Sequence, residues 1–269
     1  GTSSMIIRVD SIDNLTKDVA DCIHTPISKM LSDIRSINFR MSDERGIDYL
    51  TSHEHEKLTE VYLCHLARRL KESNGNFLFP LDELLLTPNA FSDFLKDYDI
   101  SFQKDLAGEM ILFYHEQKID WKTNKNRGFN PSRFSKRLRD DFCINGFQFL
   151  YDININTGPD YNSYIGAPEF IRDIDYLLNI GLVQEYREKS SGYVALCRLS
   201  SDEVTFDRPR QNCDFDTQYL YGALGFIWEY HNAKSINGNN PIIRAMDYSK
   251  VRVEQWIEEK DIPLQSKLR

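Results

Sequence analysis

The sequence predicts a mainly α-helical fold of the α+β class, with small β-hairpins between the helices. Long segments such as residues 11–37 place apolar residues three or four positions apart, which is the spacing of a helix with one buried face. Asn130 followed by Pro131 is typical of a helix start, because Asn caps a helix and Pro is favoured at its first position. Two β-rich runs flank a Ser-Ser-Gly sequence within residues 181–199, which predicts a hairpin.

In the first half of the chain, the same spacing predicts several helices. They are expected at residues 11–37 with a kink at Pro26, and at residues 43–72, 90–97 and 102–117. The Ser-Asn-Gly-Asn run that starts at Ser73 favours a left-handed cap and ends the second of these helices. A short apolar strand or turn is expected at residues 77–81.

The second half alternates helices with β-rich and loop segments. We expect a basic loop at 120–130, a helix at 131–142, a strand at 147–153, a linker at 154–168, a helix at 168–178, the hairpin at 181–199, and helices at 215–232 and 249–260. The segment from Asn240 to Ile257 could also be a helix-turn-helix, although a terminal helix pair that closes the fold is the simpler interpretation. The chain then divides into a helical region (5–100), a module with a basic helix (101–158), a second module (159–200) and a helical C-terminal extension (201–269).

The composition is that of a folded protein without a membrane span. Hydrophobic residues make up 41% of the 269 residues, and 14 Tyr and 16 Phe argue against disorder. Residues 1–4 precede Met5 and are interpreted as a cloning scar. No apolar run is long enough to cross a bilayer, and no charged-then-apolar leader follows Met5, so we expect a cytoplasmic protein. The five Cys are widely spaced with no CxxC, which favours reduced thiols over disulfides or a zinc site.

The charge is unevenly distributed along the chain. The formal net charge is −8, and residues 1–100 carry 11 Lys/Arg against 17 Asp/Glu. Residues 118–139 instead carry eight Lys/Arg against Asp120 alone, a net charge of +7. A basic segment on an acidic chain predicts one anion-binding face on a body that otherwise repels polyanions.

Two segments resemble the winged-helix superfamily. The first is the basic loop and helix within residues 101–158. The second is the string Leu177–Val183, which reads Leu-Leu-Asn-Ile-Gly-Leu-Val and is followed by the β-rich run Gly192–Leu199. In that superfamily a helix ending in such a string precedes a two-stranded wing. The acidic body and the long flanking helices also resemble, in general layout, winged-helix accessory subunits of SMC-type complexes of plasmid and phage-defence systems. The resemblance implies binding to DNA or protein without catalysis.

The residues themselves predict DNA binding by the first module. Arg on a helix can pair with guanine or clamp phosphates, and Lys in the preceding loop adds phosphate contacts. The candidate DNA-binding residues are Lys122, Lys125, Arg127, Asn130, Arg133, Lys136, Arg137 and Arg139. The second module is acidic, which favours a protein partner, and a further apolar stripe on the N-terminal helices would suit a partner or a homo-oligomer if it were exposed. We therefore expect a non-catalytic DNA-binding adaptor subunit without a cofactor.

Two other functions remain open. The chain could be a protein-only assembly subunit. It could also be a metal-dependent nuclease of the PD-(D/E)xK type, in which Asp82, Asp120 and Lys122 form the motif and Glu116 supplements it. A bare Asp-x-Lys arises often by chance, and the residues before Asp120 look helical and not strand-like.

Other catalytic and metal patterns are weak. The sequence has no phosphate-binding glycine loop and no nucleophile elbow. His53, His55, Cys64 and His65 are expected to lie on one helix, where their spacing would prevent them from meeting at a single ion.

Overall fold

The computed structural model describes residues 4–38, 43–140, 143–150, 167–232, 241–246, 250–258 and 261. Its helices are α1 (Ile12–Cys22), α2 (Ile27–Ile37), α3 (Asp43–Thr51), α4 (Leu81–Leu86), α5 (Ala90–Asp97), α6 (Pro131–Arg139), α8 (Glu169–Leu178), α9 (Leu182–Glu188) and α10 (Phe215–Asn232), with a 3-10 turn at Ser201–Glu203. Its strands are β1 (Ser4–Met5), β2 (Lys57–Leu58), β3 (Glu60–Leu70), β4 (Phe77–Leu78), β5 (Ile100–Lys104), β6 (Met110–Tyr114), β7 (Gln117–Ile119), β8 (Ile144–Phe147), β9 (Ser190–Ser200), β10 (Val204–Phe206), β11 (Ile242–Ala245), β12 (Val251–Arg252) and β13 (Gln255–Glu258).

The central element is an antiparallel sheet in the order β10-β11-β8-β3-β9-β13. Its longest pair is β3 with β9, which are in register from Glu60 opposite Ser200 to Leu70 opposite Ser190. A separate three-stranded meander, β5-β6-β7, lies at the other end of the molecule. The chain is therefore a mixed α+β protein, as predicted in outline, but its sheet is far larger than the small hairpins that the sequence suggested.

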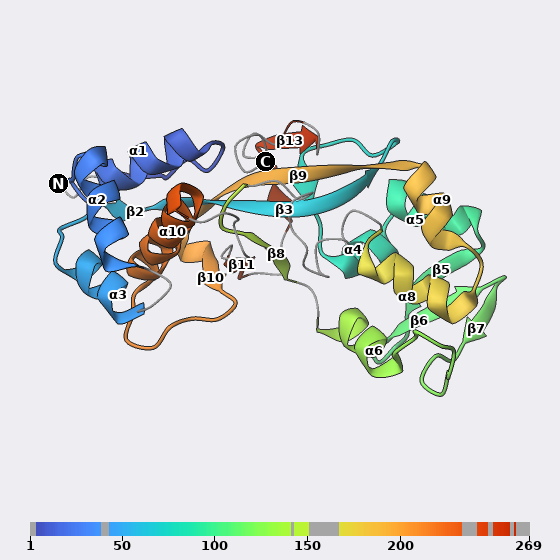
Figure 1. Cartoon of the computed structure of the whole chain (residues 1–269). Helices are drawn as coiled ribbons and strands as arrows, with labels where there is room; N and C mark the ends of the chain where they lie inside the picture. Colours follow the sequence, from blue (N-terminus) through green and yellow to red (C-terminus); the bar gives the residue numbers. More distant parts are fainter. Residues whose placement is uncertain are drawn as a thin grey trace.

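Two hydrophobic cores form two lobes, which the long β3–β9 pair connects (Figure 1). The first core lies between the sheet and helices α1, α2, α3 and α10, and includes Val19, Leu63 and Tyr219. The second core joins α4, α5, α6, α8 and α9 to the β5–β7 meander, around Phe134 and Ile174. The segments that build the two lobes alternate along the chain. The four-part division of the sequence stays a prediction about which parts fold independently.

Several predicted helices are confirmed because their ends carry local signals. The helix at 11–37 divides at Pro26 into α1 and α2, and Ser11 caps α1 by accepting a hydrogen bond from the backbone N–H of Asn14. α5 begins after Asn89, which forms a capping box with Ser92. The predicted bounds of α5 and α10 match the structure, and the helix predicted from Pro168 is present as α8.

The long helix predicted at residues 43–72 is wrong beyond residue 51. α3 ends at Thr51, and the chain then forms β2 and β3. Eleven residues of β3 pair with β9, more than a hundred residues later in the chain. Long-range pairing of this kind overrides local helix propensity, because it satisfies the backbone and buries both faces of the strand.

The amphipathic helix predicted at residues 102–117 is also wrong, since β5, β6 and part of β7 occupy this segment. The hairpin between β5 and β6 turns at residues 105–109. There Asp105 accepts hydrogen bonds from the backbone N–H groups of Ala107 and Glu109, and Gly108 has a φ of +81°. An Asp side chain that bonds the backbone two residues on and a glycine with positive φ are turn signals that outweighed the helical spacing.

Three further predictions are corrected. The hairpin at residues 181–199 is absent, because α9 is followed by one continuous strand, β9, in which Ser191 and Gly192 pair with Arg69 and Arg68. The terminal helix at 249–260 is wrong, since β12 and β13 lie within it. The strand predicted at 147–153 is wrong over residues 148–150, because β8 runs from Ile144 to Phe147, with Gly146 inside it; residues 151–153 lie outside the described residues. The linker predicted at 154–168 lies outside the described residues up to residue 166.

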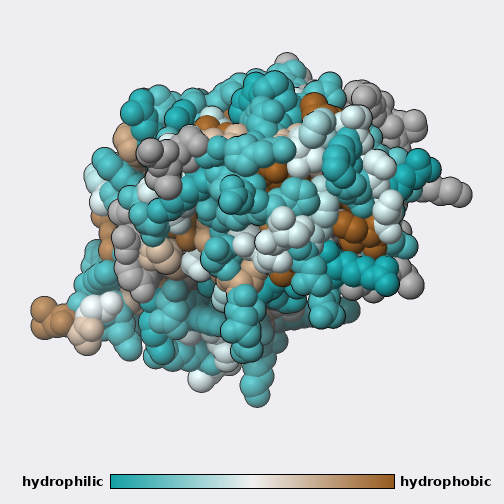
Figure 2. All heavy atoms as spheres, turned by 90° about the vertical axis from the view of Figure 1, so that its left-hand side faces the viewer, coloured by the Kyte–Doolittle hydropathy of each residue, from teal (hydrophilic) through white to brown (hydrophobic). Residues whose placement is uncertain are grey.

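The apolar stripe of the N-terminal helices is mostly buried. Leu15, Val19 and Ile34 are at most 1% exposed, and only Ile27 at the start of α2 is exposed, at 42%. Figure 2 shows the end of the molecule that α1, α2 and α3 form, and its surface is largely hydrophilic with scattered apolar patches. The stripe therefore packs in the first core and offers no broad face to a partner. None of the helices in the described ranges has both the length and the apolar character needed to cross a membrane.

A half-buried ion pair in the first lobe predicts a pH dependence of stability. Burial alone would raise the pKa of Asp18, but hydrogen bonds from the backbone and guanidinium of Arg8, 2.8–2.9 Å long, outweigh it and lower the pKa. The charge of Lys17 acts in the same direction. Because the folded state binds this proton less readily than the unfolded state, the contribution of Asp18 is present above the ordinary Asp pKa of about 3.9. It should be lost as the pH falls further, through the lower pKa of the folded state.

Chemical denaturation as a function of pH tests this prediction by comparing the unmodified chain with Asp18→Asn. The difference in free energy of unfolding should be constant at neutral pH and shrink below about pH 4. A difference that stays unchanged down to about pH 2 would contradict it.

Candidate functional site

The predicted basic helix is present as α6, and local signals position it. Asn130 caps it by accepting a hydrogen bond from the backbone N–H of Arg133, and Pro131 is its first residue. Phe134 is fully buried, and its ring lies 5.3 Å from that of Trp121. The indole Nε1–H of Trp121 donates to Ser135 Oγ at 2.9 Å. The loop before α6 and the buried face of α6 are therefore fixed to the second core.

Two of the eight Lys and Arg in residues 118–139 face α8. Arg133 Nη2 lies 2.9 Å from Asp173 Oδ1, and Arg137 Nε lies 2.9 Å from Asp173 Oδ2. Arg137 also pairs with Glu169, the first residue of α8. The side chain of Asp173 is only 3% exposed, so these pairs join α6 to α8 inside the lobe. Sequence reasoning assigned both arginines to DNA, whereas their geometry is that of structural contacts.

The other cations are exposed and form no ion pair within the described residues. We call this set the basic surface, and it comprises Lys118, Lys122, Lys125, Arg127, Lys136 and Arg139. They come from β7, the loop that follows it, and α6, which all lie in the lower part of the second lobe in Figure 1.

Part of the basic surface surrounds a hollow of about 460 Å³. Lys118, Lys122 and Arg139 line it, together with Asp105 and Asp120 among its carboxylates. Both carboxylates already accept backbone hydrogen bonds, Asp120 from the N–H of Lys122 and Asp105 from the β5–β6 turn. Cations and acids are thus mixed here, so the hollow is not a uniformly positive groove, and its carboxylates oppose the approach of a phosphate.

The loop that carries Lys125 and Arg127 is held on α8. Asn126 Nδ2 donates to the backbone carbonyl of Leu177 at 2.9 Å. Gly128, with a φ of +88°, lies against Tyr176, and a Cβ at this position would approach the ring to 2.7 Å. Arg127 and Arg172 line a second hollow beside this contact. The loop therefore has a defined position, in which its cations point away from the core.

The residues of the nuclease motif lie on separate elements of the second lobe. Asp82 lies on α4, with Lys104 Nζ 4.0 Å away, whereas Asp120 lies in the turn after the edge strand β7. Among the described residues, which include Asp82, Glu116 and Asp120, no three His, Cys, Asp or Glu side chains are placed to hold a metal ion. Of the histidines expected on one helix, His65 lies on β3 instead.

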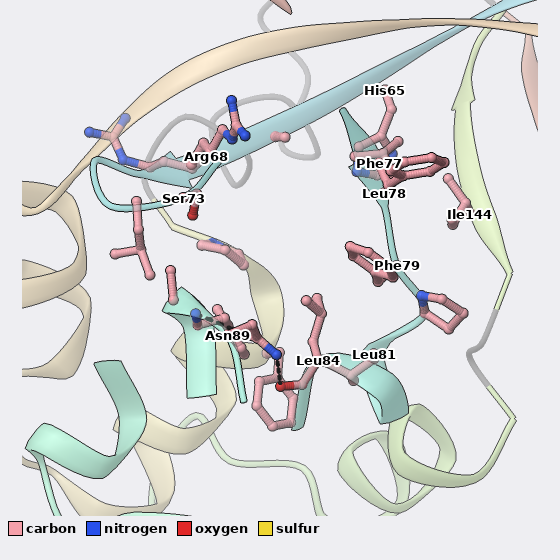
Figure 3. Close-up of a pocket in the computed structure, with 18 of the residues that line it drawn as sticks. His65, Arg68, Ser73, Phe77, Leu78, Phe79, Leu81, Leu84, Asn89 and Ile144 are labelled. Atoms are coloured by element: carbon pink, nitrogen blue, oxygen red, sulfur yellow. Dashed lines mark hydrogen bonds between the residues drawn. The ribbon is translucent and has the colours of Figure 1, made fainter. Parts of the chain in front are cut away.

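A larger cleft, which sequence reasoning missed, lies between the lobes. Its volume is about 750 Å³, and it is bounded by the second-lobe end of β3, the loop 72–79, the start of α5 and the start of α8. It follows the side of β3 that β8 leaves uncovered, since β8 pairs with β3 only at Cys64. Figure 3 shows His65, Phe77 and Ile144 at one end of this interlobe cleft, Phe79 in its middle, and Leu84 and Asn89 at the other end.

The cleft was missed because its walls come from segments that were predicted as helices. His65 and Arg69 belong to the wrongly predicted helix 43–72, and Trp256 belongs to the wrongly predicted terminal helix. Within residues 60–70, an alternation of apolar and polar residues is the local signal that could have indicated a strand. Comparison with protein-family models, with curated proteins and with solved structures found no match, so the function of this chain is argued from its own residues.

Proposed function

We propose that this chain binds DNA through its basic surface, as a non-catalytic subunit of a DNA-handling assembly. The observation that carries the proposal is the set of exposed cations on β7, the following loop and α6 that form no ion pair within the described residues, on a chain whose net charge is −8. Cations that are already ion-paired have little left to offer a phosphate. Unpaired, exposed Lys and Arg release counterions from DNA when they bind it.

The contacts are expected to fix position without reading sequence. Lys is a point charge that suits phosphate oxygens, and two of the three arginines of α6 are held by Asp173, which leaves only Arg139 on this helix for a base edge. We therefore expect weak binding that varies little with DNA sequence, because the acidic remainder of the chain opposes it.

The helices α8 and α9 are the part of the structure that supports the resemblance to winged-helix proteins. A short turn joins these two helices, in which the carboxylate of Asp175 accepts hydrogen bonds from the backbone N–H groups of Ile180 and Val183. A helix pair of this kind supports the helix-turn-helix part of the resemblance, while the strand that follows pairs with β3 and forms no wing. A protein partner or a homo-oligomer, an SMC-type assembly and a cytoplasmic location remain part of the proposal and rest on the sequence.

Charge reversal tests the proposal. Fluorescence anisotropy with a short labelled DNA duplex should show binding at about 50 mM salt. Replacing Lys122, Lys125 and Lys136 by Glu should weaken that binding at least about tenfold and lower the salt slope by roughly three, one for each lost phosphate contact. These side chains are exposed, so the substitutions should leave the thermal midpoint almost unchanged.

A matched control changes the net charge equally on the first lobe. Lys17, Arg35 and Lys57 are exposed there, and replacing them by Glu should reduce the affinity for DNA much less. Equal losses in both variants, or no binding by the unmodified chain, would contradict the proposal. The nuclease alternative is tested by adding Mg²⁺ to the DNA. Cleavage of the DNA that is abolished by Asp120→Ala would overturn a non-catalytic role.

A further inference from the structure

Pairing across three strands places the functional groups of the interlobe cleft on one face of the sheet. His65 lies opposite Ala195, and Ala195 lies opposite Trp256. Directly opposed residues share a face, and so do alternate residues of one strand, so Arg69 lies on the same face as His65. The guanidinium of Arg69 confirms this, because it lies 4.3 Å from the centre of the Trp256 ring.

Arg69 is a partly buried cation with no counterion among the described residues. Its one hydrogen bond in the structure runs from Nη2 to the backbone carbonyl of Gly75, and no carboxylate of the described residues pairs with it. Burial lowers the pKa of Arg69, which shows that its surroundings disfavour the positive charge. Its remaining N–H groups are free to donate to an anion, and a planar guanidinium stacked on an aromatic ring presents them in a fixed direction.

His65 adds a hydrogen-bond acceptor. Its Nδ1 lies 2.5 Å from the backbone carbonyl oxygen of Asn145, and because a carbonyl oxygen only accepts, Nδ1 carries the proton. Burial lowers the pKa of His65, so the ring is neutral at pH 7 and Nε2 is an acceptor. Two polar atoms of the cleft wall, Asn145 Oδ1 and Trp256 Nε1, are buried and have no hydrogen-bond partner among the described residues. An unsatisfied buried polar group calls for an explanation, which a bound ligand would supply here, although Gln148 Oε1 and Tyr219 Oη in the first lobe also lack a partner among the described residues.

The remainder of the cleft is mixed, because apolar and aromatic side chains share its wall with Ser and Asn residues and with Glu72 and Glu169, of which Glu169 pairs with Arg137. Phe77, Phe79, Phe91, Leu84 and Ile144 line it, and its volume of about 750 Å³ lies within the range of sites for small organic molecules. Other cations at its edge are already engaged, since Arg68 donates to the backbone carbonyls of two neighbouring residues and Arg137 pairs with the acids of α8.

We propose that the interlobe cleft binds a small organic anion with a flat apolar body, whose carboxylate or phosphate is held by Arg69 beside Trp256. The flat body packs among the phenylalanine side chains, and a donor group on it reaches His65 Nε2. This site is separate from the basic surface, so its occupation and DNA binding can be measured independently.

Isothermal titration with matched probes tests the site. The probes are 2-naphthoate, its neutral isostere 2-naphthamide, adenosine monophosphate and inorganic phosphate. At least one flat anion should bind saturably with one site per chain, and naphthoate should bind about tenfold or more tightly than the amide, a difference of about 1.4 kcal/mol. The relative affinity of naphthoate and adenosine monophosphate indicates whether the carboxylate or the phosphate is preferred. Equal binding of naphthoate and its amide, or no binding of either flat anion, would overturn the proposal.

Variants connect the binding to Arg69. In Arg69→Met the preference for naphthoate over its amide should disappear, while Lys57→Met, on the first lobe, should bind as the unmodified chain does. A second variant, Ala90→Trp, tests the cleft without changing Arg69. Ala90 lines the cleft at the partly exposed start of α5, so a larger side chain there should block the binding of both flat anions. Unchanged affinity in correctly folded Arg69→Met, or in Ala90→Trp, would contradict the site.

Discussion

Replacement of Asp173 by Ala should lower the free energy of unfolding by about 3 kcal/mol, because it leaves two arginines without their shared carboxylate. Arg137 is only 16% exposed and cannot turn fully into water, although Glu169 still pairs with it. Arg133 is 47% exposed and should lose less. For a chain of this size the change corresponds to a fall in thermal midpoint of about 6–12 °C. Differential scanning calorimetry and urea denaturation measure it.

A control for this prediction is Asp48→Ala, which removes an exposed carboxylate from α3. Its effect should stay within about 0.5 kcal/mol. If both substitutions cost the same, the ion pairs between α6 and α8 would not stabilise the second lobe.

Substitution of Gly146 by Val should destabilise the first lobe by about 3 kcal/mol, at the upper end of what overpacking costs. A Cβ at this position would contact the side chain of Leu63 and approach the backbone oxygen of Cys64 to 2.8 Å. A leucine side chain can move, but the backbone of β3 is fixed by its long pairing with β9. The substitution therefore has to separate β8 from β3, and chemical denaturation should show the loss.

The control for Gly146 is Thr205→Ala, a small change on the neighbouring edge strand β10, which should have little effect. A second variant, Gly146→Ala combined with Leu63→Ala, separates the two contacts. If the double variant is as stable as Leu63→Ala alone, the backbone contact with Cys64 has no cost, and a clash between β8 and the backbone of β3 would not explain the loss.

Local signals explain which elements could be predicted from the sequence. α1, α5 and α6 carry Ser or Asn caps whose side chains bond the first turn, and a proline precedes α2 and α8. A cap and its helix are neighbours in sequence, so a single segment contains both. For the same reason the break at Pro26 and the position of the basic helix were predicted correctly.

Long-range pairing explains what could not be predicted. Whether residues 60–70 form a strand depends on residues 190–200, and β13 forms only because β9 is there to pair with it. Cys64 interrupts a simple alternation, because it is buried next to Leu63. The apolar residues of this segment therefore fit a helix as well as they fit a strand.

The same limit applies to the candidate sites. The basic segment could be found from its charge, since its Lys and Arg lie within one short stretch of the sequence. That Asp173 would neutralise Arg133 and Arg137 could not be found, because the carboxylate lies on a different helix. The interlobe cleft combines side chains from β3, β13 and α5, and only the folded chain brings these together.

The salt dependence of DNA binding by the unmodified chain tests the proposed function most directly. If about four cations of the basic surface contact phosphates, the logarithm of the association constant should fall with the logarithm of salt concentration with a slope near −3.6. Raising salt from about 50 to about 200 mM should then weaken binding roughly a hundredfold. A slope near zero, or the same slope after reversal of Lys122, Lys125 and Lys136, would contradict a DNA-binding role for the basic surface.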